Sequence, residues 1–135
     1  MANINEICSK IVTDVPDSLG CAVVDLETGL LLGVAHNVPY FTQSYLDAVA
    51  AAAVDMFRGR TVTTVEELLS RNRGEEVRHM LKEIQMTTEN TYHFMAIVPQ
   101  KPDALMVLIT STKASLGAGW SAVRTALPDV AANTP

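Results

Sequence analysis

Short segments that are apolar on successive residues constrain the fold of this chain more than any other feature. Residues 104–111 read ALMVLITS, and residues 21–25 and 30–35 carry similar runs. A strand with one face in water alternates apolar and polar side chains, whereas a strand covered on both faces is apolar throughout. The sequence therefore predicts a sheet with helices on both faces, and segment 104–111 is expected at its centre.

Glycine, proline and asparagine indicate where the strands end. The predicted strands are, in chain order, 21–25, 30–35, 83–89, 92–99 and 104–111. The first two form a hairpin, in whose turn Gly29 supplies the positive φ that a tight turn needs. Residues 77–83 also keep helical spacing, so this stretch is left open between helix and strand.

Helical periodicity marks the remaining segments. Apolar residues recur at i, i+3, i+4 and i+7 from Ile4 to Ile11, and a second apolar stripe runs from Leu116 to Leu127. A central helix starts after Pro39 and ends at Gly59, and a short helix follows it. The residues expected to cap these four helices are Asn3, Thr42 or Ser44, Thr64 and Ser115.

The fold class that follows is α/β (α+β), a five-stranded antiparallel sheet with helices on both faces. Its main element order is α-β-β-α-β-β-β-α. A chain of 135 residues fits a single domain, which we place at 1–128. Residues 129–135 are expected to form a flexible C-terminal tail.

Composition excludes several classes of function. The formal charge is −5, with 15 acidic and 10 basic residues, which argues against nucleic-acid binding. The chain has no apolar run of the roughly 20 residues that a membrane span needs, and its N-terminus has no apolar signal core. The expected localisation is therefore cytoplasmic. Cys8 and Cys21 are expected to be reduced and buried, although a disulfide is left open.

The central helix contains the stretch SYLDAVAAAAVDMFRGR, which shows no polar face between Ala48 and Val54. One stripe is expected to cover the sheet: Leu46, Val49, Ala50, Ala53 and Phe57. The opposite side carries Ala48, Ala51, Ala52 and Asp55. Alanine is a good helix former, which would explain these residues without any partner. The alternative, which we favour, is that this side packs against another chain.

No motif in the sequence predicts catalysis, and we expect no catalytic residues, no metal site and no cofactor. His36, His79 and His93 lie far apart and in no metal-binding spacing. Asp25 and Glu27 belong to a turn that commonly carries such residues. Lys113 precedes small residues at a helix start, but without the spacing of a phosphate-binding loop. An enzyme that uses Asp25 or His36 stays a weak alternative.

Three stretches together resemble the Roadblock family of dynein light chains and bacterial MglB-type proteins. These are GCAVVDLETGLLLG, YLDAVAAAAVDMF and LMVLITSTKASLGAGWSAVR, and the resemblance covers residues 4–127. It implies a roadblock-type domain with a profilin- or longin-like fold. Family members form dimers through the central helix and an edge strand. They serve as non-enzymatic regulators or scaffolds of small Ras-like GTPases or motor complexes.

Carried over to this sequence, the resemblance implies two parts of an interface. On the central helix they are Ala48, Ala51, Ala52, Asp55 and Gly59, and on the third strand Ile84, Met86 and Thr88. An unpaired edge strand is a ready template for pairing, which agrees with that assignment. The charged insert 58–80 departs from the family pattern, and its role is left open.

The leading hypothesis is a non-enzymatic homodimeric regulator or scaffold that acts on a small GTPase or another NTPase. Its expected partners are a second copy of the chain and that GTPase or NTPase. The alternative is a small-molecule sensor, because a sheet with helices on both faces can enclose a pocket. The residues expected to line such a pocket are Tyr40, Phe41, Tyr92, Phe94 and Trp120.

Overall fold

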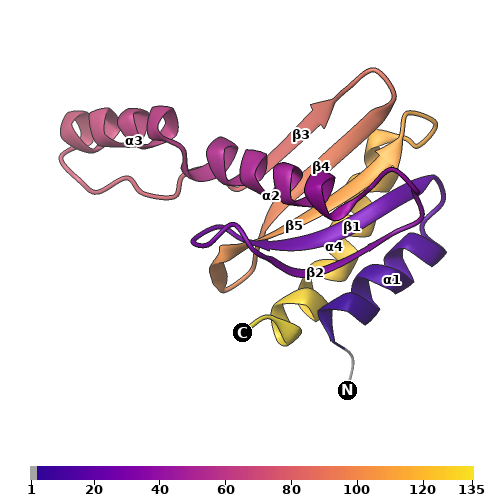
Figure 1. The fold of residues 1–135 in the computed structure, drawn as a ribbon. Coiled ribbons are helices and arrows are strands. Elements are labelled where there is room, and N and C mark those ends of the chain that lie inside the picture. Colours follow the sequence, from indigo (N-terminus) through magenta and orange to yellow (C-terminus); the bar gives the residue numbers. More distant parts are fainter. Residues whose placement is uncertain (1–2) are drawn as a thin grey trace.

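A five-stranded antiparallel sheet forms the centre of the computed structural model, which describes residues 3–135 (Figure 1). The strands are β1 (Ser18–Asp25), β2 (Leu31–His36), β3 (Glu83–Thr87), β4 (Thr91–Val98) and β5 (Lys101–Ser111). Their spatial order is β2-β1-β5-β4-β3. The doubly apolar strand β5 is therefore central, as predicted, because only a central strand has a helix layer over each face.

Helices cover both faces of this sheet, which confirms the predicted fold class. The helices α1 (Ile4–Asp14) and α4 (Leu116–Asn133) pack on one face, and α2 (Gln43–Arg58) lies on the other (Figure 1). A further helix, α3 (Arg60–Arg73), projects from the end of α2 beyond the sheet. In the described part of the chain, no helix is long and apolar enough to cross a membrane.

Alternate side chains of β5 build two separate cores. Ala104, Met106 and Leu108 point to the α1–α4 side, where they meet Phe94 and Val123. The intervening residues point to the α2 side and pack with buried residues of α2, and these residues are Leu105, Val107 and Ile109. Since successive side chains of a strand point to opposite faces, a continuous apolar run supplies both cores at once.

Three of the predicted caps are confirmed. The side-chain oxygens of Asn3, Thr42 and Ser115 each accept a hydrogen bond from a backbone N–H three residues on, at 2.9, 3.3 and 3.1 Å. Gly29 has a φ of +75° in the turn between β1 and β2, also as predicted. Cys8 and Cys21 are both buried free thiols, and a hydrogen bond to Cys8, together with burial, raises the pKa of the Cys21 thiol.

The prediction for the start of the short helix is wrong. Helix α3 begins at Arg60, and Gly59 both ends α2 and precedes α3. Thr64 lies inside the helix, where its hydroxyl donates to the Arg60 carbonyl at 2.9 Å. The residues 60–63 contain no helix breaker, so the helix starts directly after the one glycine that turns the chain.

The predicted C-terminal tail is also wrong for residues 129–133, because α4 continues to Asn133. Val130 is fully buried and anchors this last turn against the core. Pro128 lies within the helix, where its missing N–H costs one helical hydrogen bond. The burial of Val130 offsets that loss, which local helix-breaking rules do not include.

The structure shows the conformation of residues 77–83, which the sequence left open between helix and strand. It starts at Glu83, as expected, and residues 77–82 are not helical. It ends at Thr87, two residues before the predicted end. The backbone N–H of Thr88 donates to the Thr91 carbonyl at 2.9 Å and so belongs to the turn into β4.

Candidate interaction surface

The two stripes predicted on α2 are present. Leu46, Ala50, Ala53 and Phe57 are buried against the sheet, and Val49 is half-buried. On the opposite side, Ala48, Ala51, Ala52 and Asp55 are exposed. We call these four residues the alanine face. Alanines in water gain nothing from hydrophobic burial, so a partner that covers them would add stabilisation that this single chain lacks.

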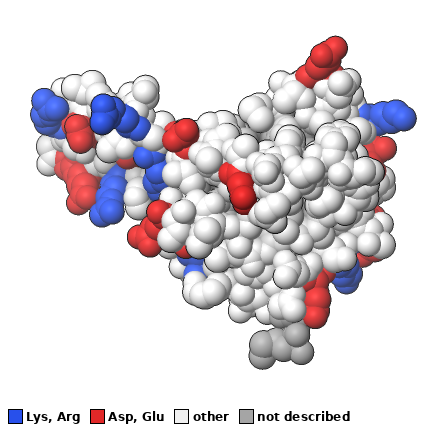
Figure 2. Space-filling view, viewed as in Figure 1, with Lys and Arg blue, Asp and Glu red and all other residues white. Residues whose placement is uncertain are grey.

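Charge is distributed unevenly over the face of the molecule that Figure 2 shows. Lys, Arg, Asp and Glu side chains gather on the projecting α3 end, whereas the surface over α2 and the sheet is largely uncharged. The charged residues of the alanine face and its border are Asp47 and Asp55, both exposed. A surface with few charges loses little solvation energy when another protein covers it.

Gly59, predicted as part of the interface, has a structural role of its own. A Cβ at this position would lie 2.3 Å from the carbonyl oxygen of Asp55. Such a distance is far too short for any side chain, so glycine is required where α2 turns into α3. Gly59 is half-buried in the single chain, and its identity does not depend on a partner.

The two edges of the sheet differ in how they are protected. At the β2 edge, the side-chain oxygen of Asn5 accepts a hydrogen bond from the Val34 N–H at 2.9 Å. Helix α1 packs so closely there that a Cβ at Gly33 would lie 2.3 Å from Ile4. Strand β3 forms the other edge and is short. It is therefore the edge at which another strand can add.

The register of β3 with β4 decides which backbone groups are free. The pairs Lys82–Ile97 and Thr88–Thr91 are hydrogen-bonded, and β3 is paired in register between them. Hydrogen-bonded pairs alternate in an antiparallel ladder, so Ile84 and Met86 also bond to β4. The backbone groups that face outward are those of Glu83, Gln85 and Thr87.

The three residues predicted for the edge interface occupy different positions. Thr88 lies in the turn, and Ile84 and Met86 contribute side chains instead of free backbone groups. Both side chains are half-buried on the α2 side of the sheet, where they pack against the same core as α2. The structure therefore brings the β3 side chains and α2 to one side of the sheet, as a joint interface requires. That this surface is an interface stays a prediction.

The residues considered for catalysis are not brought together. Asp25 lies at the turn end of the β1–β2 hairpin and accepts a hydrogen bond from the Glu27 N–H at 2.9 Å. His36 lies at the other end of that hairpin, where its Nδ1 accepts from the Val38 N–H at 3.2 Å. Among residues 3–135, no group of three or more His, Cys, Asp and Glu side chains could hold a metal ion.

His93 is buried in β4, with its Nε2 3.0 Å from the Thr91 hydroxyl oxygen. Burial lowers the pKa of its imidazole. In the unfolded chain this histidine has its ordinary pKa of about 6.5 and binds a proton below that pH. In the folded chain the buried imidazole stays neutral to a lower pH. Neutral His93 makes its full contribution to the stability of the fold above about pH 6.5, and this contribution is lost as the pH falls below that value.

We expect the thermal midpoint of the wild type to fall more steeply than that of His93→Gln between about pH 7.5 and 5.5. Melting curves recorded by circular dichroism across this range measure the difference. Both proteins retain His36 and His79, so the difference in slope isolates His93. Parallel slopes would contradict the buried neutral imidazole.

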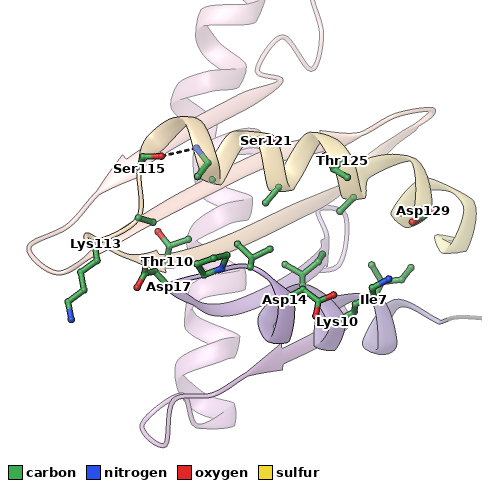
Figure 3. Close-up of a pocket in the computed structure, with 18 of the residues that line it drawn as sticks. Ile7, Lys10, Asp14, Asp17, Thr110, Lys113, Ser115, Ser121, Thr125 and Asp129 are labelled. Carbon is green, nitrogen blue, oxygen red and sulfur yellow. Dashed lines mark hydrogen bonds between the residues drawn. The ribbon is translucent and has the colours of Figure 1, made fainter.

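A groove of about 900 Å³ runs between α1 and α4 on the other side of the molecule (Figure 3). Ile7, Lys10 and Asp14 line it from α1, and Ser121, Thr125 and Asp129 from α4. The five aromatic residues predicted for a ligand pocket are not among its lining residues. Phe41 packs on the α2 side of the sheet and Phe94 on the α4 side, so these aromatics do not share a pocket.

Sequence reasoning missed two features of the surface. The first is this groove, whose walls come from opposite ends of the chain. The second is the projection of α3, which lies beyond the sheet with Val65 and Leu68 exposed at 40% and 49%. The spacing of Val62, Val65 and Leu69 gives a local signal for an apolar stripe, but no local pattern shows what covers it.

Several solved structures share this fold. Myxococcus xanthus MglB gives a TM-score of 0.68 at 17% sequence identity, over 96% of this chain and 92% of that one. A Roadblock/LC7 domain from Streptomyces avermitilis gives a TM-score of 0.68 at 14% sequence identity, over 96% of this chain and 95% of that one. A structure described as MglB with a tetrameric arrangement gives a TM-score of 0.69 at 17% sequence identity, over 95% of this chain and 85% of that one. No family model and no curated protein matches the sequence. The resemblance predicted from the sequence is confirmed at the level of the fold.

Proposed function

We propose that this chain, which has the fold of Roadblock/LC7 and MglB proteins, is a non-enzymatic homodimeric regulator or scaffold in the cytoplasm. Its partner in this proposal is a small Ras-like GTPase or another NTPase. The observation that carries the proposal is the alanine face, because Ala48, Ala51 and Ala52 are exposed where helices of monomers usually carry charged residues. The open β3 edge supports the same surface.

Small side chains favour a pair of helices because their backbones can approach toward the short end of the 8–10 Å range of packed helices. A two-fold axis that crosses α2 would place the alanine face of one copy on that of the other. The β3 edges could then pair across the same axis, with the free backbone groups of Glu83, Gln85 and Thr87 in the ladder.

The oligomeric state of Ala52→Arg tests this proposal. We expect the wild type to be a dimer and Ala52→Arg to be a monomer, because an arginine cannot be buried unpaired between two helices. Light scattering during gel filtration, over a wide dilution range, measures the mass. Ala52 is exposed in the single chain, so the substitution leaves the monomer folded.

Ala132→Arg is the matched control, since Ala132 is also an exposed alanine of a helix but lies on α4, away from the alanine face. This variant should remain a dimer. A wild type that is monomeric at all concentrations, or a dimer that Ala52→Arg leaves intact, would refute the interface.

The partner is tested by nucleotide-dependent capture. The sequence resemblance to MglB-type proteins implies a GTPase partner, so the immobilised protein is incubated with lysate of its source organism in GDP or in a GTP analogue. We expect one GTPase to be enriched in one of the two nucleotide states. If no GTPase is enriched in either state, the partner assignment fails, although the homodimer could still stand.

The groove between α1 and α4 favours a second candidate function, which is the binding of a small molecule. Its volume of about 900 Å³ lies in the range of ligand pockets. A thermal-shift screen against metabolites tests it, because a ligand at 100 times its dissociation constant adds about 2.7 kcal/mol of stability. Thr125→Arg, which fills the groove, should abolish any shift that arises there.

A further inference from the structure

The groove between α1 and α4 is long and has an apolar floor. Its α1 wall is lined from Glu6 to Asp14 and its α4 wall from Ser115 to Asn133, so it runs along most of both helices (Figure 3). The apolar lining residues of the floor are buried or half-buried, and they are Ile7, Ile11, Ala122 and Ala126. The rims are polar and exposed, so the groove separates an apolar bottom from a charged opening.

We infer that this groove binds an amphipathic helix of a partner protein, with Lys or Arg on the flanks of its apolar stripe. The inference goes beyond the regulatory role proposed above. It does not rest on the homodimer, because the alanine face of α2 lies on the opposite side of the sheet from α1 and α4. A chain with both surfaces would hold two partners at once, as a scaffold does.

The dimensions of the groove fit a helix that is embedded to half its depth. Helix α1 has 11 residues and is about 16 Å long, so a volume of about 900 Å³ along it corresponds to a cross-section of about 55 Å². An α-helix with its side chains is about 10–12 Å across, and half of its cross-section is about 40–55 Å². The groove therefore has the width that half a helix needs.

The open side of the groove also favours a helix. A small-molecule pocket encloses most of its ligand. Here the rim residues Lys10, Ser121 and Thr125 are exposed, so an occupant keeps one side in water. An amphipathic helix has a polar side for that position. On the α4 wall, alanines follow one another at four-residue spacing from Ala118 to Ala126, and such small side chains let another helix approach closely.

The charge of the rims is complementary to a basic helix. Six charged residues line the groove, of which four are acidic and two basic, and they are Glu6, Asp14, Asp17, Asp129, Lys10 and Lys113. All six are exposed, and within residues 3–135 none of them forms an ion pair. Asp17 lies at one end of the groove and Asp129 at the other (Figure 3). Basic residues at both ends of an apolar stripe would therefore meet a carboxylate at each end.

The helix dipoles add to this negative potential. Asp14 is the last residue of α1, and Asp129 lies near the end of α4. Carboxylates are unfavourable near the C-terminal end of a helix, where cations are stabilising. Neither helix has a basic residue in its last turn. A bound helix with Lys or Arg flanks would supply the positive charge that this chain leaves out.

Selection from a display library of helical peptides tests the inference. Peptides of about 18 residues, as long as α4, are selected on the wild type and depleted on Ala118→Trp. Ala118 is an exposed residue of the groove wall, so tryptophan fills the groove without changing its charge. We expect the enriched peptides to share an apolar stripe at helical spacing with Lys or Arg beside it. Acidic flanks, or no peptide that Ala118→Trp rejects, would overturn the inference.

Ala132→Trp is the matched control, since Ala132 is exposed on α4 but does not line the groove, and it should bind the selected peptides normally. Fluorescence anisotropy then measures the role of charge. Asp14→Asn with Asp129→Asn should weaken binding about three- to tenfold, because two exposed ion pairs are lost. Glu75→Gln with Glu89→Gln removes the same charge outside the groove and should have no effect. Equal losses in the two double variants would overturn the complementarity.

The same variants identify other occupants. A metabolite whose thermal shift is lost in Ala118→Trp, with no peptide selected, would make the groove a small-molecule pocket. A higher oligomer of the wild type that Ala118→Trp dissociates would make the occupant a second copy. Either result would overturn the partner helix. Ala52→Arg should bind the selected peptides as the wild type does, so a failure of the homodimer leaves this inference standing.

Discussion

Gly119→Ala is expected to lower the free energy of unfolding by about 1–3 kcal/mol, the usual cost of adding atoms to a filled core. Gly119 is buried where α4 crosses the ring of Phe94. A Cβ at this position would lie 2.2 Å from Cζ and 2.4 Å from Cε2 of that ring. Both atoms belong to a fully buried side chain, so the ring cannot swing into solvent to make room.

Gly117→Ala is the matched control, since Gly117 belongs to the same first turn of α4 and a Cβ there would have no neighbouring atom within 4 Å. It should be neutral or raise stability by up to about 1 kcal/mol, because alanine is the better helix former. Urea unfolding midpoints measure both variants. Adding Phe94→Leu to Gly119→Ala should recover part of the loss. Equal midpoints for the two alanine variants would contradict the close approach.

Phe57→Ala is expected to lower the free energy of unfolding by about 3–5 kcal/mol, the range for removing a buried phenyl ring. Phe57 is fully buried in the last turn of α2, within the core between that helix and the sheet. A domain has a total stability of only about 5–15 kcal/mol, so this variant should unfold at a much lower urea concentration.

Leu116→Ala serves as the comparison, because Leu116 is also an apolar helix residue but is exposed at 44%. Its effect should stay within about 0.5 kcal/mol. If Phe57→Ala lost no more than Leu116→Ala, the α2 side of the sheet could not be a packed core. Both variants should be measured at one protein concentration, because a dimer adds stability by mass action.

Much of the fold could be predicted because its signals are local. The caps at Asn3 and Ser115 act on N–H groups three residues away. The continuous apolar run of β5 follows from burial on both faces, and it correctly placed this strand at the centre of the sheet. The stripes on α2 follow from a 3.6-residue period, so the exposed alanines were identifiable without a structure.

The wrong predictions arose where distant segments decide the outcome. Val130 holds the last turn of α4 in place through the core, although Pro128 precedes it. Thr88 was placed in an edge strand, but its N–H closes the turn to Thr91. The candidate interface stays a prediction, and the structure shows only that its alanines are exposed on α2 and that Ile84 and Met86 belong to the edge strand β3. The sequence did not show which backbone groups of β3 are free, because that depends on register with β4.

The sequence by itself thus determined that helices cover both faces of the sheet, the order of the helices and strands along the chain, and the alanine face of α2. Each of these follows from periodicity and capping within a few residues. Only the tertiary structure decided that Asn5 covers the β2 edge, that β3 stays open and that α3 projects with Val65 uncovered. These features depend on contacts between segments far apart in the chain. No local pattern encodes such contacts, because each segment has the same propensities whichever neighbour it meets.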